Sequence, residues 1–237
     1  MDNEFINNLE RTFNDIISEI DAKNIKYKSN DIKGIIALGY YSKVIEGVKA
    51  IIILLKENNL ESAIQPIFRS VLEAMIDLDN ILNIEGYINY LCYLDLNNKF
   101  KLGKKNYLKQ ISEKQNFDYK ETKNKIEKDI INLESKIKSK YGNRFLNNQG
   151  KINTSIKFKF ELSKNIDIYD SLYWILCTDT HNNISTIEEY YFTPIDEDLM
   201  VAFFNTMDVG KQKSVCSTLE KILKDSQNII YYILEIK

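Results

Sequence analysis

The chain has 237 residues, which is enough for one large domain or two small ones with a substantial hydrophobic core. Its charged residues nearly balance, with a net charge of −2, whereas general nucleic-acid and membrane-surface binders carry a clear excess of lysine and arginine. The three cysteines are scattered and form no CxxC motif, which argues against a structural zinc site and fits a reducing cytoplasm.

The first part of the chain predicts a cytoplasmic protein that does not insert into membranes. The N-terminal sequence MDNEFINNLE is acidic and has no apolar core of the kind that a signal peptide needs. The most apolar stretch, residues 35–55, is interrupted by Lys43, Glu46 and Lys49, so it is unsuited to span a bilayer.

Apolar residues recur at intervals of three and four over the first half of the chain, which predicts amphipathic helices. The predicted helices are residues 4–26, 32–56, 61–82 and 86–111. The segment KSND at 28–31 is suited to cap the second helix. Because only a short break at Asn58-Asn59 separates the second and third helices, we expect them to form an antiparallel hairpin.

The middle of the chain is highly charged. Residues 119–140 predict a solvated helix with one narrow apolar stripe, formed by Ile126, Ile130, Leu133 and Ile137. A nucleic-acid-binding arm is the alternative interpretation, although acidic residues are interleaved throughout the segment.

Residues 141–165 have no clear period and are expected to be irregular, with a short strand at KFKFEL, 157–162. This loop is the longest break in the pattern, so we expect it to be either a surface excursion or the hinge of a mobile flap. We therefore expect one helical domain, 1–237, that carries a charged helical or loop insertion at about 112–165.

Helical periodicity returns in the last third, over residues 166–187 and 211–236, while residues 190–209 fit either a hairpin or a short helix. Only two prolines and eight glycines interrupt the whole chain, and this scarcity also favours long helices. The patterns predict an all-α fold, a multi-helix bundle with long antiparallel helices and at most a small β-hairpin near 158–205.

The first candidate site lies in the third predicted helix, where Arg69 is one of only three arginines. Glu73 follows four residues later on the same face, and Asp77 extends that face by another turn. A guanidinium in an apolar neighbourhood needs partners. The pair could be an internal ion pair that clamps the helices, or a fork that Glu73 orients to bind phosphate or carboxylate.

The second candidate site is the segment YDSLYWILCTDTHNN, 169–183, which holds the only histidine, His181. On a helix one face would carry Asp170, Trp174, Cys177 and His181, and the neighbouring strip would carry Tyr169 and Tyr173. An imidazole has a pKa near neutrality, which suits proton transfer. A single histidine could equally be a buried, hydrogen-bonded core residue, but the polar neighbours Asp179 and Asn182 favour a site.

The sequence lacks the motifs of several common nucleotide-binding, hydrolase and metal sites. The chain has no GxxxxGK[ST], GxGxxG or GxSxG motif. Its single histidine excludes multi-histidine metal sites, and the absence of an ExxH motif argues against a carboxylate-bridged metal site. We therefore expect no metal and no cofactor. A nucleophilic pair of Cys177 and His181 stays open, because four residues separate them. Cys177 lies next to Leu176, however, which favours a packed thiol.

Two segments, 39–82 and 169–189, together resemble the bacterial family catalogued as domain of unknown function 5677. Its members carry an R-x-x-x-E helix after a small-residue turn, then a charged and variable middle, then a tyrosine-rich helix that ends in a single histidine. The resemblance spans roughly residues 35–190. That family looks like a relative of the HEPN-type helical proteins, many of which are RNA-cleaving toxins or antiviral effectors.

The resemblance implies a metal-independent ribonuclease, acting in phage defence or as a toxin, with Arg69, Glu73 and His181 as catalytic residues. His181 would move the proton of the 2′-hydroxyl or of the leaving group, and Arg69 would stabilise the charged phosphate. The expected substrate-binding residues are Tyr169, Tyr173, Asn182 and Asp77.

The sequence departs from the usual HEPN signature, in which arginine and histidine lie a few residues apart on one helix. Here the closest arginine upstream of His181 is Arg144. Arg69 and His181 would therefore have to meet between helices or across a homodimer. The alternative is a module without enzymatic activity that senses a nucleotide or another small anion, or binds a protein partner.

Overall fold

The computed structural model describes residues 4–25, 30–57, 61–104, 119–180, 187, 191–195, 198–201 and 207–235. Their helices are α1 (Glu4–Lys23), α2 (Ile32–Lys56), α3 (Glu61–Asn83), α4 (Tyr87–Lys104), α6 (Tyr119–Tyr141), α7 (Ile156–Leu162), α8 (Ile166–Ile168), α9 (Trp174–Thr180) and α11 (Val209–Ile233). A 3₁₀ turn spans Gly142–Phe145 and a π-helical turn spans Tyr169–Tyr173. The predicted all-α class is confirmed.

The chain divides into two compact units. The first comprises residues 1–82 and 159–237, and the second comprises residues 83–158. The second unit therefore interrupts the first along the sequence, and it begins well before the insertion expected at about 112–165. A single domain over 1–237 with that insertion stays a prediction.

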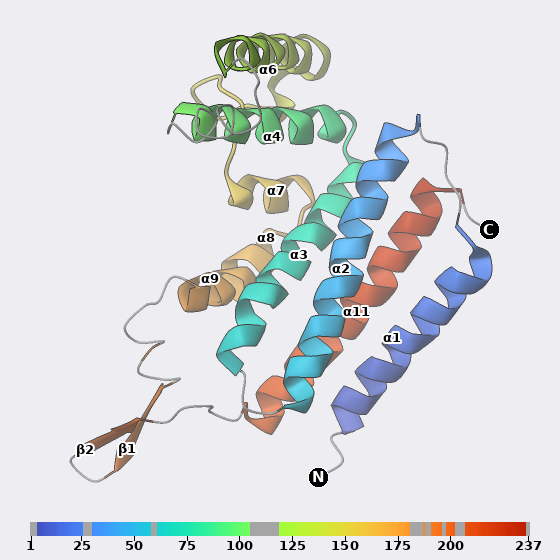
Figure 1. Ribbon diagram of the computed structural model, residues 1–237, viewed down its shortest axis with the longest axis vertical. Coiled ribbons are helices and arrows are strands. Elements are labelled where there is room, and N and C mark those ends of the chain that lie inside the picture. Colours follow the sequence, from blue (N-terminus) through green and yellow to red (C-terminus); the bar gives the residue numbers. More distant parts are fainter. Residues whose placement is uncertain are drawn as a thin grey trace. The chain divides into compact units, whose positions relative to one another are not determined.

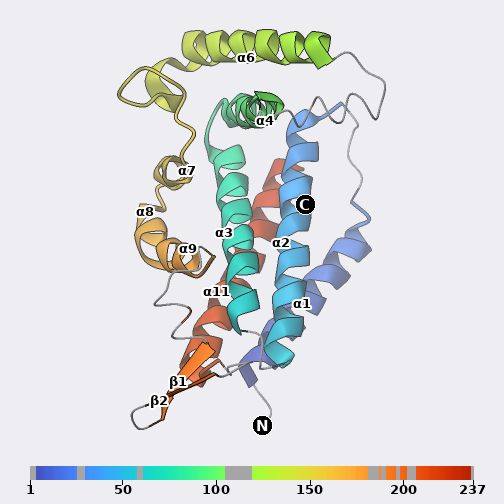
Figure 2. The same ribbon diagram turned by 60° about the vertical axis from the view of Figure 1, so that its left-hand side comes forward.

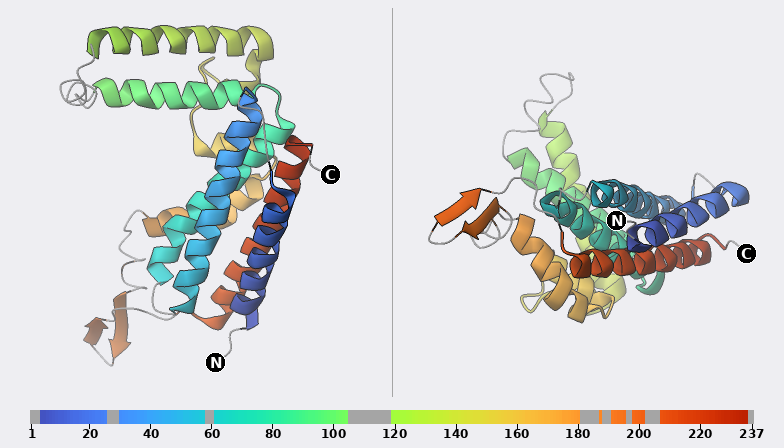
Figure 3. Two further views of the ribbon diagram at one scale, coloured as in Figure 1. Left: turned by 45° about the vertical axis from the view of Figure 1, so that its right-hand side comes forward. Right: turned by 90° about the horizontal axis from the view of Figure 1, so that it is seen from below.

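Long helices α1, α2, α3 and α11 form the body of the first unit, and α2 runs opposite to the other three (Figure 1). Figure 3 shows α1 lying along α11, and both helices also contact α2. Because α2 has several neighbours, its apolar residues occupy much of its circumference, as the sequence predicts for a central helix. Its fully buried residues include Ala37, Val44, Val48 and Ile51.

Local sequence signals set where α2 begins and how closely α3 approaches it. The carboxylate of Asp31 caps α2 by accepting a hydrogen bond of 3.0 Å from the backbone N–H of Gly34, which confirms the cap predicted at 28–31. Further along α2, a Cβ atom added to Gly47 would collide with Val71 of α3. The missing side chain at Gly47 thus allows the two antiparallel helices to pack closely.

The start of α11 is fixed in the same way and is tied to α3. Asp208 caps the helix by accepting a hydrogen bond of 2.9 Å from the backbone N–H of Lys211. The Lys211 ammonium lies 3.1 Å from the buried carboxylate of Glu61, at the first turn of α3. This ion pair joins the beginnings of the two helices.

The expected strand at KFKFEL is wrong, because these residues form helix α7. Phe158 and Phe160 have the period-two spacing that is typical of a strand. On a helix two residues apart face nearly opposite sides, and both rings are buried: Phe158 contacts Tyr90, while Phe160 contacts Tyr169. A short helix with apolar contacts on opposite sides imitates the alternation of a strand.

The second unit consists mainly of α4 and α6, which lie side by side in Figure 2. Tyr90 is fully buried, stacks on Phe145 with ring centroids 5.2 Å apart, and donates a hydrogen bond of 2.8 Å to the carbonyl of Asn153. Most of α6 is exposed or half-buried, and Ile137 is the one fully buried member of its predicted apolar stripe. The solvated helix predicted over 119–140 is confirmed.

The small β-hairpin allowed near 158–205 is present as β1 (Phe192–Ile195) and β2 (Asp198–Val201). The two strands are antiparallel, and Phe192 pairs with Val201. Among the described helices, none is both long enough and apolar enough to span a lipid bilayer.

Candidate functional site

Arg69 and Glu73, which the sequence pairs by their spacing, are in contact on α3. The Nε of Arg69 lies 3.0 Å from Oε1 of Glu73 and donates a hydrogen bond to it. The side chains are 26% and 25% exposed, respectively. The pair therefore lies at the edge of the core, where water and ligands can reach it.

Tyr173, from the π-helical turn, completes a cluster with this pair. Its hydroxyl accepts a second hydrogen bond from Nε of Arg69, at 3.1 Å, and donates one to Oε1 of Glu73, at 2.7 Å. The guanidinium carbon also lies 5.3 Å from the centroid of the Tyr173 ring. We call Arg69, Glu73 and Tyr173 the Arg69 cluster. Each member contacts both others, so the guanidinium is held in one orientation.

Aromatic rings hold the Tyr173 side of the cluster in place. Tyr173 is only 2% exposed and stacks on Tyr169 with centroids 5.1 Å apart and planes 21° apart. Phe160 of α7 packs against both rings, at 5.0 Å from Tyr173 and 5.3 Å from Tyr169. The ring therefore has little freedom to move, and its hydroxyl can position the charged partners on α3.

The protonation states in the cluster follow from its burial and its charges. Burial raises the pKa of Tyr173, and the Glu73 carboxylate that accepts its hydrogen bond raises it further. Burial alone would lower the pKa of Arg69, but the hydrogen bonds to Tyr173 and Glu73 outweigh it and raise the pKa. At neutral pH Tyr173 is thus a neutral donor and Arg69 is a cation.

Asp77, expected to extend the same face, binds a different partner. Its two carboxylate oxygens both lie 2.9 Å from the ammonium of Lys159 on α7. The side chains of Asp77 and Lys159 are only 5% and 12% exposed, respectively. The amide of Asn80 reinforces this contact by donating a hydrogen bond of 2.9 Å to the carbonyl of Lys159. The pair joins α3 to α7.

Two of the predicted site residues, His181 and Asn182, lie outside the described residues. The chain reaches them directly from α9, whose last residue is Thr180. Earlier in the same segment, Asp170 is exposed and Trp174 is 61% exposed, whereas Tyr173 and Leu176 are buried. The tyrosine strip, rather than the strip of Asp170 and Trp174, therefore packs against the rest of the unit.

Cys177 is half-buried and lies near enough to Arg69 and Tyr173 to interact with both electrostatically. In the part of the chain that the structure describes, no three His, Cys, Asp or Glu side chains are grouped so that they could hold a metal ion.

Lys159 and the π-helical turn are the features that sequence reasoning missed. Lys159 is one of many lysines, and nothing in its spacing marks it as the partner of Asp77. The π-helical turn adds a residue to one turn of an otherwise helical segment and is frequent at functional sites. No spacing in its sequence, YDSLY, predicts this extra residue.

One protein family, described as a family of unknown function (DUF5677), has a model that matches residues 33–198. This range covers α2, α3 and the segment that supplies Tyr173. No curated protein and no solved structure is significantly similar to the chain.

Proposed function

The chain belongs to the DUF5677 family, a family of unknown function, and from this premise we propose that it binds RNA at Arg69 and cleaves it with His181. The observation that carries the proposal is the fixed guanidinium of the Arg69 cluster, held by hydrogen bonds of 3.0 Å and 3.1 Å at Nε. A positioned cation at the edge of a core is what a charged phosphate transition state requires.

The geometry of the guanidinium favours a phosphate ligand. Both hydrogen bonds engage Nε, so they help to set the plane of the group. A guanidinium fixed in its plane matches the geometry of a phosphate, which it can bind through parallel hydrogen bonds. The 26% exposure of Arg69 keeps it accessible while its desolvated surroundings strengthen its field. A lysine, with a single flexible ammonium, would not provide this orientation.

His181 supplies the proton transfer in this proposal. Its neutral imidazole accepts the proton of a ribose 2′-hydroxyl, and the 2′-oxygen then attacks the adjacent phosphorus. The bond from phosphorus to the 5′-oxygen breaks, and the imidazolium returns the proton to that leaving oxygen. The products are a 2′,3′-cyclic phosphate and a 5′-hydroxyl, while Arg69 stabilises the charge on the phosphate oxygens.

Cleavage of a single-stranded RNA by the purified chain tests the proposal. We expect His181→Ala and Arg69→Ala each to slow cleavage by about a hundredfold or more, the usual contribution of a proton-transfer group or an oriented cation. Arg11→Ala is the matched control, because Arg11 is exposed on α1 and donates its hydrogen bond to Asn8. Far-ultraviolet circular dichroism confirms that each variant is folded.

The outcomes separate an enzyme from a binding module. Absence of cleavage by the wild-type chain, or undiminished cleavage by His181→Ala, contradicts the proposed reaction. RNA that binds to the wild-type chain and not to Arg69→Ala, without being cleaved, identifies a nucleotide-binding module instead. If the chain is a toxin or a defence effector, its expression in a bacterial host slows growth and the His181→Ala variant does not.

A homodimer is part of the proposal, because Arg69 and His181 belong to different segments that could complete one site from two chains. Light scattering during size-exclusion chromatography measures the oligomeric state. If the site is shared, a mixture of Arg69→Ala and His181→Ala chains recovers cleavage that neither variant has alone. A dimer whose mixture stays inactive indicates that each chain holds its own site.

A further inference from the structure

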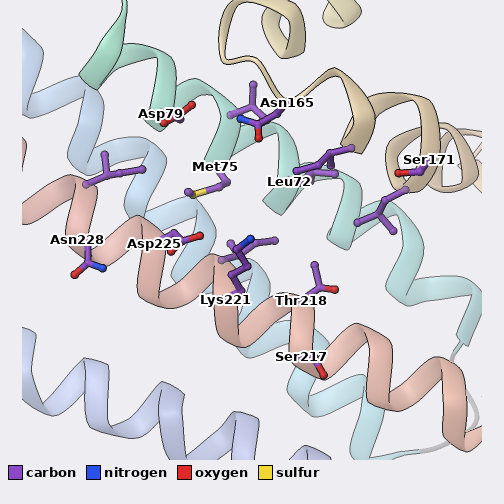
Figure 4. Close-up of a pocket in the computed structure, with 15 residues that line it drawn as sticks. Leu72, Met75, Asp79, Asn165, Ser171, Ser217, Thr218, Lys221, Asp225 and Asn228 are labelled. Carbon is purple, nitrogen blue, oxygen red and sulfur yellow. The ribbon is translucent and has the colours of Figure 1, made fainter.

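A cavity of about 760 Å³ lies in the first unit, between α3, α11 and the segment that contains α8 (Figure 4). This volume suits a small organic molecule. Its apolar surface comes from all three segments, with Leu72 and Met75 on α3, Leu172 in the π-helical turn and Ile222 on α11. The residues of the Arg69 cluster do not line it.

Polar side chains gather unevenly around the cavity. In Figure 4, Asp79, Asn165, Asp225 and Asn228 lie toward one end, while Leu72, Ser171 and Thr218 lie toward the other. Lys221 extends from α11 between the two ends. The lining carries two carboxylates and one ammonium, so negative charge is in excess. A ligand that matches this distribution has an apolar body and a polar, cationic head.

The hydroxyl groups of the lining add hydrogen-bond acceptors to those of the carboxylates. Ser171 donates its hydroxyl proton to the carbonyl of Asp167, at 2.6 Å. Ser217 and Thr218 donate theirs to backbone carbonyls one turn earlier on α11, at 2.8 Å and 2.9 Å. A hydroxyl that donates in this way turns its lone pairs outward, so these oxygens accept further hydrogen bonds.

We propose that this cavity binds a small organic amine, with its apolar body against Leu72, Met75 and Leu172 and its ammonium head near Asp79 and Asp225. The carboxylates of Asp79 and Asp225 suit the donors of an ammonium group, and they repel a carboxylate head. The proposal concerns a site other than the Arg69 cluster and does not depend on cleavage of RNA.

Methionine provides a selective probe of the cavity in the full-length chain. Met75 lines the cavity, whereas Met207 is buried elsewhere and Met200 lies exposed on β2. With methyl-labelled methionine, titration with tryptamine and with phenethylamine is followed by nuclear magnetic resonance. We expect a saturable shift of the Met75 methyl signal with these amines and unchanged Met200 and Met207 signals. Indolepropionate, which has the tryptamine body and a carboxylate head, should leave Met75 unchanged.

Two substitutions and one control complete the test. Asp225→Asn replaces the carboxylate by an uncharged amide of similar size. It should weaken amine binding by about tenfold, the equivalent of one charge-assisted hydrogen bond. Leu172→Trp should place a larger ring against the apolar body of the ligand and weaken the binding of both amines. Glu220→Gln, on the same helix but outside the lining, should change nothing.

The proposal is overturned if neither amine gives a saturable Met75 shift, if indolepropionate binds as well as tryptamine, or if Asp225→Asn and Glu220→Gln behave alike. Because Leu172→Trp could unfold the chain, Asp225→Asn carries the decision when circular dichroism shows that the larger substitution has lost its helices.

Discussion

Two of the ion pairs on helix α3, Asp77–Lys159 and Arg69–Glu73, lie about two turns apart, and they differ in how much water reaches them. Asp77 and Lys159 are 5% and 12% exposed, and the ammonium contacts both carboxylate oxygens. Arg69 and Glu73 are 26% and 25% exposed, and a third group, the Tyr173 hydroxyl, bridges them. One helix thus presents one enclosed pair and one accessible pair.

The difference in exposure favours a structural role for the Asp77–Lys159 pair and agrees with the functional role that we propose for the Arg69–Glu73 pair. A desolvated pair contributes little net stability, but loss of one partner leaves an uncompensated charge in the core. A partly exposed pair contributes little in either case. Its members can therefore be optimised for orientation and ligand binding, as we propose for Arg69.

The largest predicted effect is on the enclosed pair. Lys159→Met removes the ammonium and leaves the Asp77 carboxylate buried without its partner, which should lower the free energy of unfolding by about 3–5 kcal/mol. Urea denaturation monitored by circular dichroism measures this change. The matched control is Lys157→Met, an exposed lysine two residues away on the same helix, which should change the stability by less than about 0.5 kcal/mol.

A double substitution sharpens this result. Asp77→Leu combined with Lys159→Met removes both charges together and should recover most of the lost stability, because no charge remains uncompensated. If Lys159→Met is as stable as the wild-type chain, water reaches the pair in solution, and the contrast between the two ion pairs disappears.

The next effect concerns the bridge in the accessible pair. Tyr173→Phe keeps the ring that packs on Phe160 and Tyr169 but removes the hydroxyl, and should lower the free energy of unfolding by about 1–2 kcal/mol, the contribution of a hydrogen bond to a charged group. Tyr232→Phe is the control, since Tyr232 is exposed. Tyr173→Phe should also bind RNA less tightly than the wild-type chain, because Arg69 would lose one of the groups that orient it.

A loss of stability in Tyr173→Phe with unchanged RNA binding would show that the hydroxyl serves packing alone. If both stability and RNA binding are unchanged, the Tyr173 hydroxyl does not form its hydrogen bonds of 2.7 Å to Glu73 and 3.1 Å to Arg69 in solution.

Much of this architecture could be predicted from the sequence. Apolar residues at intervals of three and four define α1, α2, α3 and α11, because a helix buries the face on which they recur. The α7 helix could not be predicted, since Phe158 and Phe160 pack on opposite sides of it and produce the alternation of a strand.

The site was only partly predictable. The spacing of Arg69 and Glu73 suffices to place them in contact, because residues four apart on a helix are neighbours. Tyr173 is 104 residues away from Arg69 along the chain and Lys159 is 82 residues away from Asp77, and no local period encodes such contacts.

The ionisation of Tyr173 gives a smaller, pH-dependent effect. Its pKa is raised in the folded chain by burial and by Glu73, so the unfolded chain releases the proton first, near the ordinary pKa of about 10. The free energy of unfolding should therefore fall as the pH rises above about 10, by about 1 kcal/mol over the next pH unit. Tyr173→Phe lacks this contribution, so its stability difference from the wild-type chain should narrow over that range.

Urea denaturation at about pH 8 and about pH 11 compares the two chains on either side of that pKa. Other tyrosines titrate in both chains and cancel in the comparison. A stability difference that is the same at both pH values would mean that the Tyr173 hydroxyl is as well solvated in the folded chain as in the unfolded one.

The smallest predicted effect on stability belongs to Arg69→Lys, and it tests the contrast between the two pairs most directly. Lysine keeps the charge beside Glu73 but has neither the Nε donor nor the planar fork, so stability should fall by less than about 1 kcal/mol. RNA binding should weaken by at least about tenfold, because a bidentate phosphate contact is lost. Filter binding at one fixed salt concentration measures the affinity, and urea denaturation measures the stability. If Arg69→Lys instead destabilises the chain as strongly as Lys159→Met while RNA binding is unchanged, the Arg69–Glu73 and Asp77–Lys159 pairs are both structural, and the proposed site must be sought elsewhere.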